Sequence, residues 1–490
     1  MTDSADIVLV NPGNRRQVFQ SLGDDVAGIE PPFLVAVMAA YLRDKGFQAL
    51  IIDANAENLA PDEVAWRVKG YNPLLVAVIV YGSQPSASTQ NMTNAGLICT
   101  AISRSTQTKV AIGGLHPSAL PERTLCEEQV DFVIQGEGIE PLALLLKQLR
   151  TGGEEFKSVP GLWYREGGEI CSSPPPALVA DLDTGLPQAA WDLLPMQLYR
   201  AHNWHCFDDI EHRTPYAAIY TSLGCPYNCV FCCINAPFGK PGIRFRSPEQ
   251  VVAEIDLLVN RYGIKNLKIV DELFVLHEPH YMGILDLLIK RGHKLNIWAY
   301  ARVDTIKQEN LSRMKQAGIN WLALGIESAN PDVRDGASKR MRVQDVKQVV
   351  RAIQDTGIRV IGNYIFGLPD DTMTTMQETL DMALELSCEF ANFYSAMAYP
   401  GSKLYEIALE NGWKLPENWH GYSQHSYEAQ PLPTKLLGAA EVLKFRDNAF
   451  HTYFSDPGYL AMLEQKFGRS VKEHVERISA TRLKRKILGD

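Results

Sequence analysis

Short apolar segments alternate with amphipathic ones along most of this 490-residue chain, and this alternation constrains its fold more than any other feature. Strands separated by helices, and apolar on both faces, are typical of a parallel sheet with helices on both sides. Residues 1–150 are therefore predicted to form a doubly wound α/β domain. Its expected strands are Asp6–Pro12, Ala49–Ala54, Leu74–Tyr81, Lys109–Gly113 and Phe132–Gly136.

The same alternation resumes at residue 216. Six βα units are too few to close an eight-stranded barrel, so residues 216–400 are predicted to form a partial (βα)6 barrel of the TIM type. Residues 151–215, which are rich in Gly and Pro, are interpreted as a linker. The helix-rich residues 401–490 are expected to form a C-terminal helical cap. The expected barrel strands are Ala217–Leu223, Leu267–Val270, Leu295–Tyr300, Trp321–Ile326, Val360–Phe366 and Asn392–Ala398.

Composition and charge exclude several classes of protein. A hydrophobic content of 46% and a charged content of 21% are ordinary for a globular chain, and the net charge of −9 argues against nucleic-acid binding. No apolar run approaches the ~20 residues that span a bilayer, and the acidic start of the chain does not resemble a secretory signal. We therefore expect a cytoplasmic enzyme. The basic stretch 482–486 is interpreted as a solvated helix end, with weak membrane-surface contact as the alternative.

Four of the nine cysteines lie within nine residues of one another. Cys225, Cys229 and Cys232 form a C-x3-C-x2-C pattern directly after the first barrel strand. A structural zinc site would need four ligands, usually in paired knuckles, and the sequence has no second knuckle. Three thiolates can instead hold three irons of a 4Fe-4S cluster and leave the fourth iron open. Cys233 is interpreted as structural, although a role for it stays open.

This cysteine motif resembles the signature of the radical S-adenosylmethionine (SAM) superfamily. In that family the open iron binds SAM, and electron transfer from the cluster cleaves the sulfonium to give a deoxyadenosyl radical. The resemblance covers residues 216–400 and implies SAM contacts at the ends of the barrel strands. Matching positions in this sequence are Tyr227, Phe231, Glu272, Arg302, Glu327, Ser328 and Gly367.

The first domain has no G-x-G-x-x-G turn after its first strand, which makes a dinucleotide unlikely as its ligand. Small polar loops follow its third, fourth and fifth strands instead and predict a broad, shallow platform. These segments resemble the cobalamin-binding domain that is fused to many radical SAM enzymes. The implied cobalamin contacts are Tyr81, Gly82, Ser83, Gln84, Ser86, Ser88, Thr89, Gly113, Gly114, His116, Pro117, Gly136, Glu137 and Gly138.

One departure from the mutase type of cobalamin domain matters. The Asp-x-His-x-x-Gly motif is missing, and His116 follows the fourth strand, which is the wrong loop for a cobalt ligand. We therefore predict cobalamin without a histidine lower ligand, with Gln84 and the loop 83–89 nearest that face. The alternative is a degenerate domain that serves only as a scaffold.

Together the resemblances imply an enzyme that uses a 4Fe-4S cluster, SAM and cobalamin to methylate an unactivated carbon or phosphorus of a small-molecule or lipid substrate. A flavodoxin or ferredoxin is the expected reductant. Two alternatives stay open: a non-methylating relative, such as an oxidative cyclase or a rearranging or dehydrating enzyme, and an iron–sulfur electron-transfer or binding module. No catalytic residue is assigned. Four residues are candidate substrate contacts, with packing at the barrel rim as the alternative interpretation. They are Tyr394, Tyr399, His425 and Tyr427.

Overall fold

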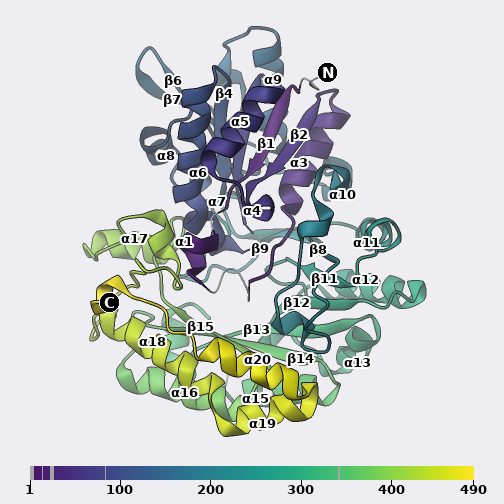
Figure 1. Ribbon diagram of the computed structural model, residues 1–490, viewed down its shortest axis with the longest axis vertical. Helices are drawn as coiled ribbons and strands as arrows, with labels where there is room; N and C mark the ends of the chain where they lie inside the picture. The colour runs from purple at the N-terminus through teal and green to yellow at the C-terminus, as the bar shows by residue number, and fades with distance from the viewer. Residues whose placement is uncertain (1–4, 14, 22–26, 83, 340–342) are drawn as a thin grey trace.

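The computed structural model describes residues 5–13, 15–21, 27–82, 84–339 and 343–490. In Figure 1 the first sheet lies above an open barrel, and the C-terminal helices run along the lower side of that barrel.

The first sheet is doubly wound, as predicted. Its parallel strands lie in the order β2-β1-β3-β4-β5, and alternate side chains along each strand enter different cores. Ile7 and Leu9 of β1 pack with residues of α3 and α9, whereas Val8 and Val10 pack with residues of α5 and α6. This period of two follows from the pleat of a strand that is buried on both faces. The elements are β1 (Ile7–Asn11), α1 (Arg15–Phe19), α3 (Phe33–Asp44), β2 (Ala49–Asp53), α4 (Ala54–Glu57), α5 (Pro61–Tyr71), β3 (Leu75–Val80), α6 (Pro85–Ser105), β4 (Lys109–Gly114), α7 (Leu115–Ala119), α8 (Pro121–Glu127), β5 (Phe132–Ile134) and α9 (Ile139–Arg150).

This sheet continues beyond residue 150, where the sequence analysis begins the linker. β6 (Leu162–Glu166) pairs antiparallel with β5, and β7 (Glu169–Ser172) pairs with β6. The hairpin turns at Gly167 and Gly168, whose φ angles of 59° and 90° suit glycine. Part of the expected linker is therefore an extension of the first domain, and α10 (Leu182–Gly185) and short 3-10 turns follow it.

The second sheet is an open parallel half-barrel, also as predicted, with six strands in the order β15-β14-β13-β12-β11-β8. Its elements are β8 (Tyr216–Ile219), α11 (Pro248–Tyr262), β11 (Asn266–Ile269), α12 (Glu278–Arg291), β12 (Asn296–Arg302), α13 (Gln308–Gln316), β13 (Ile319–Glu327), α14 (Pro331–Gly336), α15 (Val343–Asp355), β14 (Arg359–Phe366), α16 (Met373–Leu386) and β15 (Phe390–Ser395).

The first barrel strand expected from the sequence is divided in two. After β8 the chain leaves the barrel sheet, and β9 (Ser222–Cys225) pairs antiparallel with β10 (Gly242–Phe245). Gly224 permits this pairing because its φ is 92° and a Cβ there would lie 2.4 Å from the carbonyl oxygen of Gly242. The division places Cys225 on a separate ribbon.

The C-terminal region is helical and covers the barrel edge. Helix α18 packs against the edge strand β15, and the short turn η6 (Trp419–Tyr422) packs against α6 of the first domain. Other helices of this region are α17 (Lys403–Glu410), α19 (Pro457–Phe467) and α20 (Arg469–Ser479), with α18 spanning Ala439–Phe454. Among the described residues, no helix is both long and apolar enough to cross a membrane.

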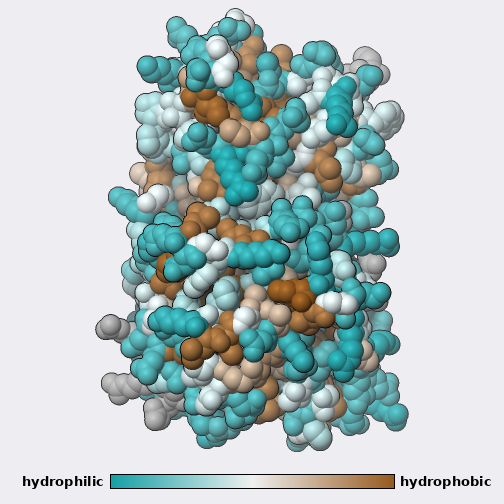
Figure 2. All heavy atoms as spheres, turned by 90° about the vertical axis from the view of Figure 1, so that its left-hand side faces the viewer, coloured by the Kyte–Doolittle hydropathy of each residue, from teal (hydrophilic) through white to brown (hydrophobic). Residues whose placement is uncertain are grey.

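The basic stretch 482–486 is not the solvated helix end that the sequence analysis expects. Its first four residues lie in irregular structure, and the side chain of Arg485 is 1% exposed and paired with Asp447. Figure 2 views the side of the molecule that carries α6 and α17 and shows a mostly hydrophilic surface with separate apolar patches. Small separate patches of this kind are ordinary on protein surfaces.

Candidate active site

The three cysteines lie on one loop that backbone contacts hold in place. Cys225 ends β9, and the loop that carries Cys229 and Cys232 is tied to α17 by a hydrogen bond from the Leu404 N–H to the Val230 carbonyl oxygen at 2.8 Å. Burial raises the pKa of each thiol, that of Cys225 to about 11. The Cys229 charge also raises the pKa of Cys225 and of Cys232, so Cys229 lies near both.

These residues fit an iron–sulfur cluster better than a single metal ion. Among the described residues, no three His, Cys, Asp or Glu side chains converge as ligands of one ion do. Thiolates that bind three different irons of a cubane do not converge on one point. A cluster would also relieve the mutual repulsion of the thiolates, because bound metal ions deprotonate thiols outright.

Asp271, at the end of β11, fixes the turn from which the cysteine loop starts. Its carboxylate accepts hydrogen bonds from the Thr221 N–H at 2.6 Å, the Thr221 hydroxyl at 2.5 Å and the Ser222 hydroxyl at 2.6 Å. All three residues are buried. The sequence predicts a role only for the neighbouring Glu272, so the positioning role of Asp271 was missed. Its place at a strand end could have indicated that role.

Glu272, whose binding of SAM stays a prediction, lies beside the cysteine loop. Burial raises the pKa of its carboxyl to about 7, against the opposing effect of Lys268. Its charge in turn raises the pKa values of Cys225 and Cys232. A carboxylate near the open side of the cysteine loop is suited to accept hydrogen bonds from an ammonium group.

Arg302 and Tyr227 are brought together next to the same loop. The guanidinium carbon of Arg302 lies 4.0 Å from the centroid of the Tyr227 ring, and its Nε and Nη2 each donate to Asp304 at 2.9 Å. This ion pair raises the pKa of Arg302 against the effect of burial. Asp304 uses two of the five guanidinium donors, which leaves the Nη1 donors for a carboxylate ligand.

Glu327 and Lys339 form a buried ion pair on the other side of Cys229. Both charges act on the pKa of Cys229, and so does Arg302, which places all three near that thiol. Glu327 has a φ of 66° where the register between β13 and β14 shifts, a strained conformation that is typical of functional sites. Lys339 is absent from the sequence-based assignments because no motif marks it.

The other SAM positions make mainly internal contacts. Phe231 packs beside Leu368 and Ala396, and the N–H of Gly367 donates to Asp371 at 2.9 Å. The Ser328 hydroxyl is fully buried and lies 3.2 Å from the Thr379 hydroxyl of α16. The structure therefore brings Glu272, Arg302 and Glu327 to the cysteine loop but turns the Ser328 side chain away.

A cavity of ≈ 330 Å³ lies between the two sheets. From the first domain it is lined by four of the predicted cobalamin positions, Tyr81, Gly82, Gln84 and Ser86. From the barrel it is lined by Tyr220, Tyr300, Asn363 and Tyr394 among others. Burial raises the pKa values of Tyr220 and Tyr300, and the charge of Glu272 adds to this effect, so Glu272 lies near both tyrosines.

Several predicted cobalamin positions are instead internal. The Ser88 hydroxyl donates to the Val80 carbonyl oxygen and accepts from the His116 N–H at 3.0 Å. Nδ1 of His116 lies 3.3 Å from the Thr89 hydroxyl, and its ring lies 4.3 Å from that of Trp419. Burial lowers the pKa of His116 to about 3. His116 therefore belongs to the packing between α6, α7 and the C-terminal region.

Three glycines of the predicted platform have positive φ but do not line the cavity. They are Gly114, Gly136 and Gly138, and a Cβ on Gly114 would lie 2.2 Å from the Val80 carbonyl oxygen. The Glu137 carboxylate is occupied by Arg244, whose Nη2 and Nη1 donate to it at 2.7 and 3.0 Å. Gly113 and Pro117 are buried next to these loops, and Ser83 lies outside the described residues.

Three of the four candidate substrate contacts reach the cavity. Tyr394, Tyr399 and His425 line it. Tyr427 is 41% exposed and donates to the Asp490 carbonyl oxygen at 3.0 Å, so this candidate belongs to the surface.

The strand ends of the first sheet and the inner face of the barrel enclose one cavity, and a three-cysteine loop follows the first barrel strand. This arrangement defines an α/β enzyme that binds its cofactors between two sheets. Residues 219–383 match the Radical SAM superfamily, and residues 20–146 match the B12 binding domain. The chain belongs to the radical SAM superfamily, among the members that carry a B12 binding domain. Its cofactors are a 4Fe-4S cluster, SAM and cobalamin.

Several known proteins resemble most of the length of this chain. The uncharacterized methyltransferase PH0819 of Pyrococcus horikoshii is 31% identical over 432 residues, which cover 88% of this chain and 89% of that protein. The anaerobic magnesium-protoporphyrin IX monomethyl ester cyclase of Cereibacter sphaeroides is 24% identical over 458 residues, 91% of this chain and 70% of the cyclase. The structure of the radical SAM methyltransferase TsrM from Kitasatospora setae, with cobalamin and a [4Fe-4S] cluster bound, covers 93% of this chain and 90% of its own at 20% identity, with a TM-score of 0.69.

Proposed function

We propose that the protein is a methyltransferase that uses SAM and cobalamin to methylate an unactivated carbon or phosphorus centre of a small molecule. One observation carries the proposal: the strand ends of the cobalamin domain and the inner face of the barrel sheet line the same cavity. A methyl carrier on one wall and a radical generator beside the other need a substrate between them. The methyltransferase name of the Pyrococcus relative, which matches most of the chain, supports this choice.

The residues of the barrel edge divide the binding of the cluster and of SAM among them. Cys225, Cys229 and Cys232 would hold three irons, and Asp271 keeps their loop in place. Glu272 is suited to the amino group of SAM and Arg302 to its carboxylate. When bound, the cluster supplies the electron that cleaves the sulfonium of SAM, and cobalamin carries a methyl group. The expected electron donor is a flavodoxin or ferredoxin.

Cobalamin binds to the platform without a histidine lower ligand. The burial of His116 under Trp419 supports this assignment, because its ring nitrogens do not line the cavity. Gln84 precedes α6 in an extended conformation and lines the cavity. Its side chain would lie nearest the corrin. Backbone loops with glycines let a large flat ligand approach closely.

The test is an anaerobic turnover with methyl-labelled SAM. The protein is loaded with iron, sulfide and hydroxocobalamin, reduced with titanium(III) citrate, and analysed for deoxyadenosine and for label on cobalamin. We expect both products in the wild type and no deoxyadenosine when the three loop cysteines are replaced by Ala. Deoxyadenosine without labelled cobalamin would contradict methylation and favour a non-methylating enzyme such as an oxidative cyclase. Neither product would favour an iron–sulfur module without SAM chemistry.

A further inference from the structure

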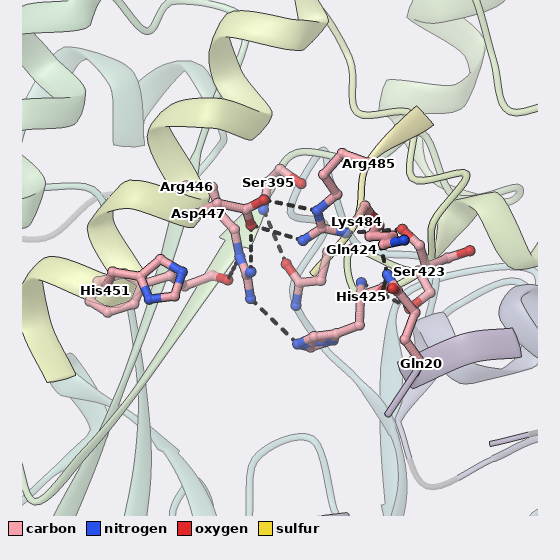
Figure 3. A network of polar contacts seen from close by, with 12 residues as sticks. Gln20, Ser395, Ser423, Gln424, His425, Arg446, Asp447, His451, Lys484 and Arg485 are labelled. Atoms are coloured by element: carbon pink, nitrogen blue, oxygen red, sulfur yellow. Dashed lines mark hydrogen bonds and ion pairs between the residues drawn. The ribbon is translucent and has the colours of Figure 1, made fainter. Parts of the chain in front are cut away.

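The C-terminal region contributes a buried cationic cluster to the wall of the cavity (Figure 3). The cluster consists of Arg446, Asp447 and Arg485, with His425 and Gln424 beside it. The side chains of Arg446 and Arg485 are only 5% and 1% exposed. Arg446, His425 and Gln424 line the cavity, whereas Asp447 and Arg485 lie behind them.

Within the cluster, Nη2 of Arg446 has a weaker hydrogen bond than Nε and Nη1. Its Nε donates to the Phe393 carbonyl oxygen at 2.7 Å and its Nη1 to Asp447 at 2.9 Å. Arg485 donates to the same carboxylate through Nε and Nη2, both at 2.8 Å. Nη2 of Arg446 lies 3.4 Å from Nε2 of His425, which is a long distance for a hydrogen bond.

Two guanidinium groups share the Asp447 carboxylate, because Arg446 and Arg485 both donate to it. A second carboxylate, that of Asp490, accepts from the backbone N–H of Arg485 at 2.7 Å and does not line the cavity. His425 adds no positive charge, because burial and the two guanidinium groups hold its pKa well below its usual range. A buried cation that shares its carboxylate with a second cation is incompletely compensated, so its free donors at a cavity wall favour an anionic ligand.

The rest of the cavity offers apolar surface and paired or neutral polar groups. Aromatic side chains such as Trp298, Phe390 and Phe450 cover much of it. Nζ of Lys268, which also lines the cavity, is paired with Glu30 at 3.0 Å. Arg15 also lines the cavity. A cavity with aromatic walls and a guanidinium at its wall suits a molecule with an apolar body and an anionic group.

We infer that the substrate carries a carboxylate or phosphate on an apolar body and that Arg446 binds this anion, with His425 and Gln424 beside it. The inference deepens the proposed function and rests on the cavity between the sheets being the substrate site. A guanidinium is well suited to the task, because its planar donors match a carboxylate or phosphate oxygen pair.

Equilibrium dialysis with three matched probes tests this inference. Cluster- and cobalamin-loaded protein is dialysed against 2-naphthoate, 2-naphthyl phosphate or 2-naphthalenemethanol, which share one apolar body. We expect at least one anion to bind about tenfold or more tightly than the alcohol, since hydrogen bonds to charged groups are worth that much. Whichever anion binds more tightly identifies the group that the substrate carries.

Two variants locate the preference. Arg446→Met should abolish the advantage of the anion over the alcohol. Arg359→Met is the matched control: Arg359 pairs with Asp208 and stacks on Phe467 outside the cavity, so this variant should keep the full preference. If Arg446→Met does not fold, the comparison of anion and alcohol on the wild type still decides.

Equal binding of all three probes to the wild type would overturn the inference. A second result would also overturn it: naphthoate binds to protein loaded with the cluster alone, but no longer binds once cobalamin is added. Arg446 would then hold the phosphate of the corrinoid. Failure of this inference can be distinguished from failure of the proposed function. Selective anion binding without labelled cobalamin would support the anion site and contradict the methyltransferase proposal. Labelled cobalamin without a preference for the anion would support the methyltransferase proposal and contradict the anion site.

Discussion

The carboxyl ends of the strands in the two sheets use different parts of the chain. At the barrel edge, side chains carry the chemistry: three thiols, Glu272 and Arg302 lie together around one loop. At the edge of the first sheet, the polar side chains that the sequence offers are mostly consumed in internal contacts, as Ser88 and His116 show. What remains there is mainly backbone, opened by glycines such as Gly114.

The difference follows from the ligands that each edge is built to hold. A metal cluster needs covalent ligands at fixed positions, and buried hydrogen bonds of the barrel hold the cysteine loop in place. A broad flat cofactor needs close approach over a wide area, and side chains would stand in its way. A residue that resembles a functional one therefore carries more information at the barrel edge than at the first sheet.

Removal of the thiols should give the largest effect. Replacing Cys225, Cys229 and Cys232 with Ala should abolish the cluster absorbance and reduce bound iron to background after anaerobic reconstitution, because no other group supplies the lost ligands. Cys233→Ala is the matched control next to the same loop, since Cys233 is buried, and it should keep the cluster. If the variant without the three cysteines still bound a full cluster, side chains of this loop would not carry the chemistry of the barrel, and the comparison with the first sheet would fail.

Asp271→Ala should come next, because it leaves three buried donors without their acceptor. We expect a loss of about 3 kcal/mol or more in the free energy of unfolding, measured by urea titration of the cluster-free protein, together with weaker cluster loading. Ser222→Ala removes a single one of these hydrogen bonds and should cost about 1 kcal/mol. Equal losses in the two variants would show that Asp271 does not organise the cysteine loop.

The backbone character of the first edge predicts the effect of Gly114→Ala. A Cβ at this position meets the Val80 carbonyl oxygen, and the φ of 135° is nearly restricted to glycine. We expect a cost of about 2–4 kcal/mol and at least a tenfold loss of cobalamin affinity, with the cluster retained. Gly152→Ala is the control, because Gly152 also has a positive φ but a Cβ there would meet no atom within 4 Å. Unchanged cobalamin affinity in Gly114→Ala would contradict the backbone platform.

Local periodicity predicted both sheets, but contacts between distant segments set much of the detail. The division of the first barrel strand into β8 and β9 depends on Asp271, some 50 residues later in the chain. The hairpin β6–β7 joins the first sheet because β5 offers a free edge, which composition does not reveal. A strand-period pattern cannot show which of these pairings forms.

The candidate site divides in the same way. Cys225 was predictable from the spacing of the cysteine motif, and Glu272 and Arg302 from the family resemblance at strand ends, with their SAM-binding roles still predictions. The burial of His116 was not, because it depends on Trp419 in the C-terminal region. Lys339 and the cluster around Arg446 were also missed, since their importance comes from ion pairs and from a cavity wall that the fold alone assembles.

The smallest expected effect is a difference in pH dependence between the two domains. Near the barrel edge, the ion pair with Arg302 lowers the pKa of Asp304, so this pair stabilises the fold at neutral pH and the stabilisation is lost as the pH falls. In the first domain, the carboxyl of Glu128 packs over Gly96, and burial raises its pKa to about 7. Its contribution has the opposite sign, because the folded state keeps a proton that the unfolded chain loses near pH 4.5.

The free energy of unfolding should therefore fall by roughly 1–2 kcal/mol between about pH 4.5 and 7 because of Glu128, allowing for its partial contact with solvent. Glu128→Gln removes the titrating group and should flatten this part of the profile, measured by urea unfolding at pH 5 and pH 8. Glu122→Gln is the control, because Glu122 is exposed on the neighbouring helix α8, and it should keep the wild-type slope. If both variants keep that slope, the pH dependence of the first domain has another origin and the contrast with the barrel pair does not hold.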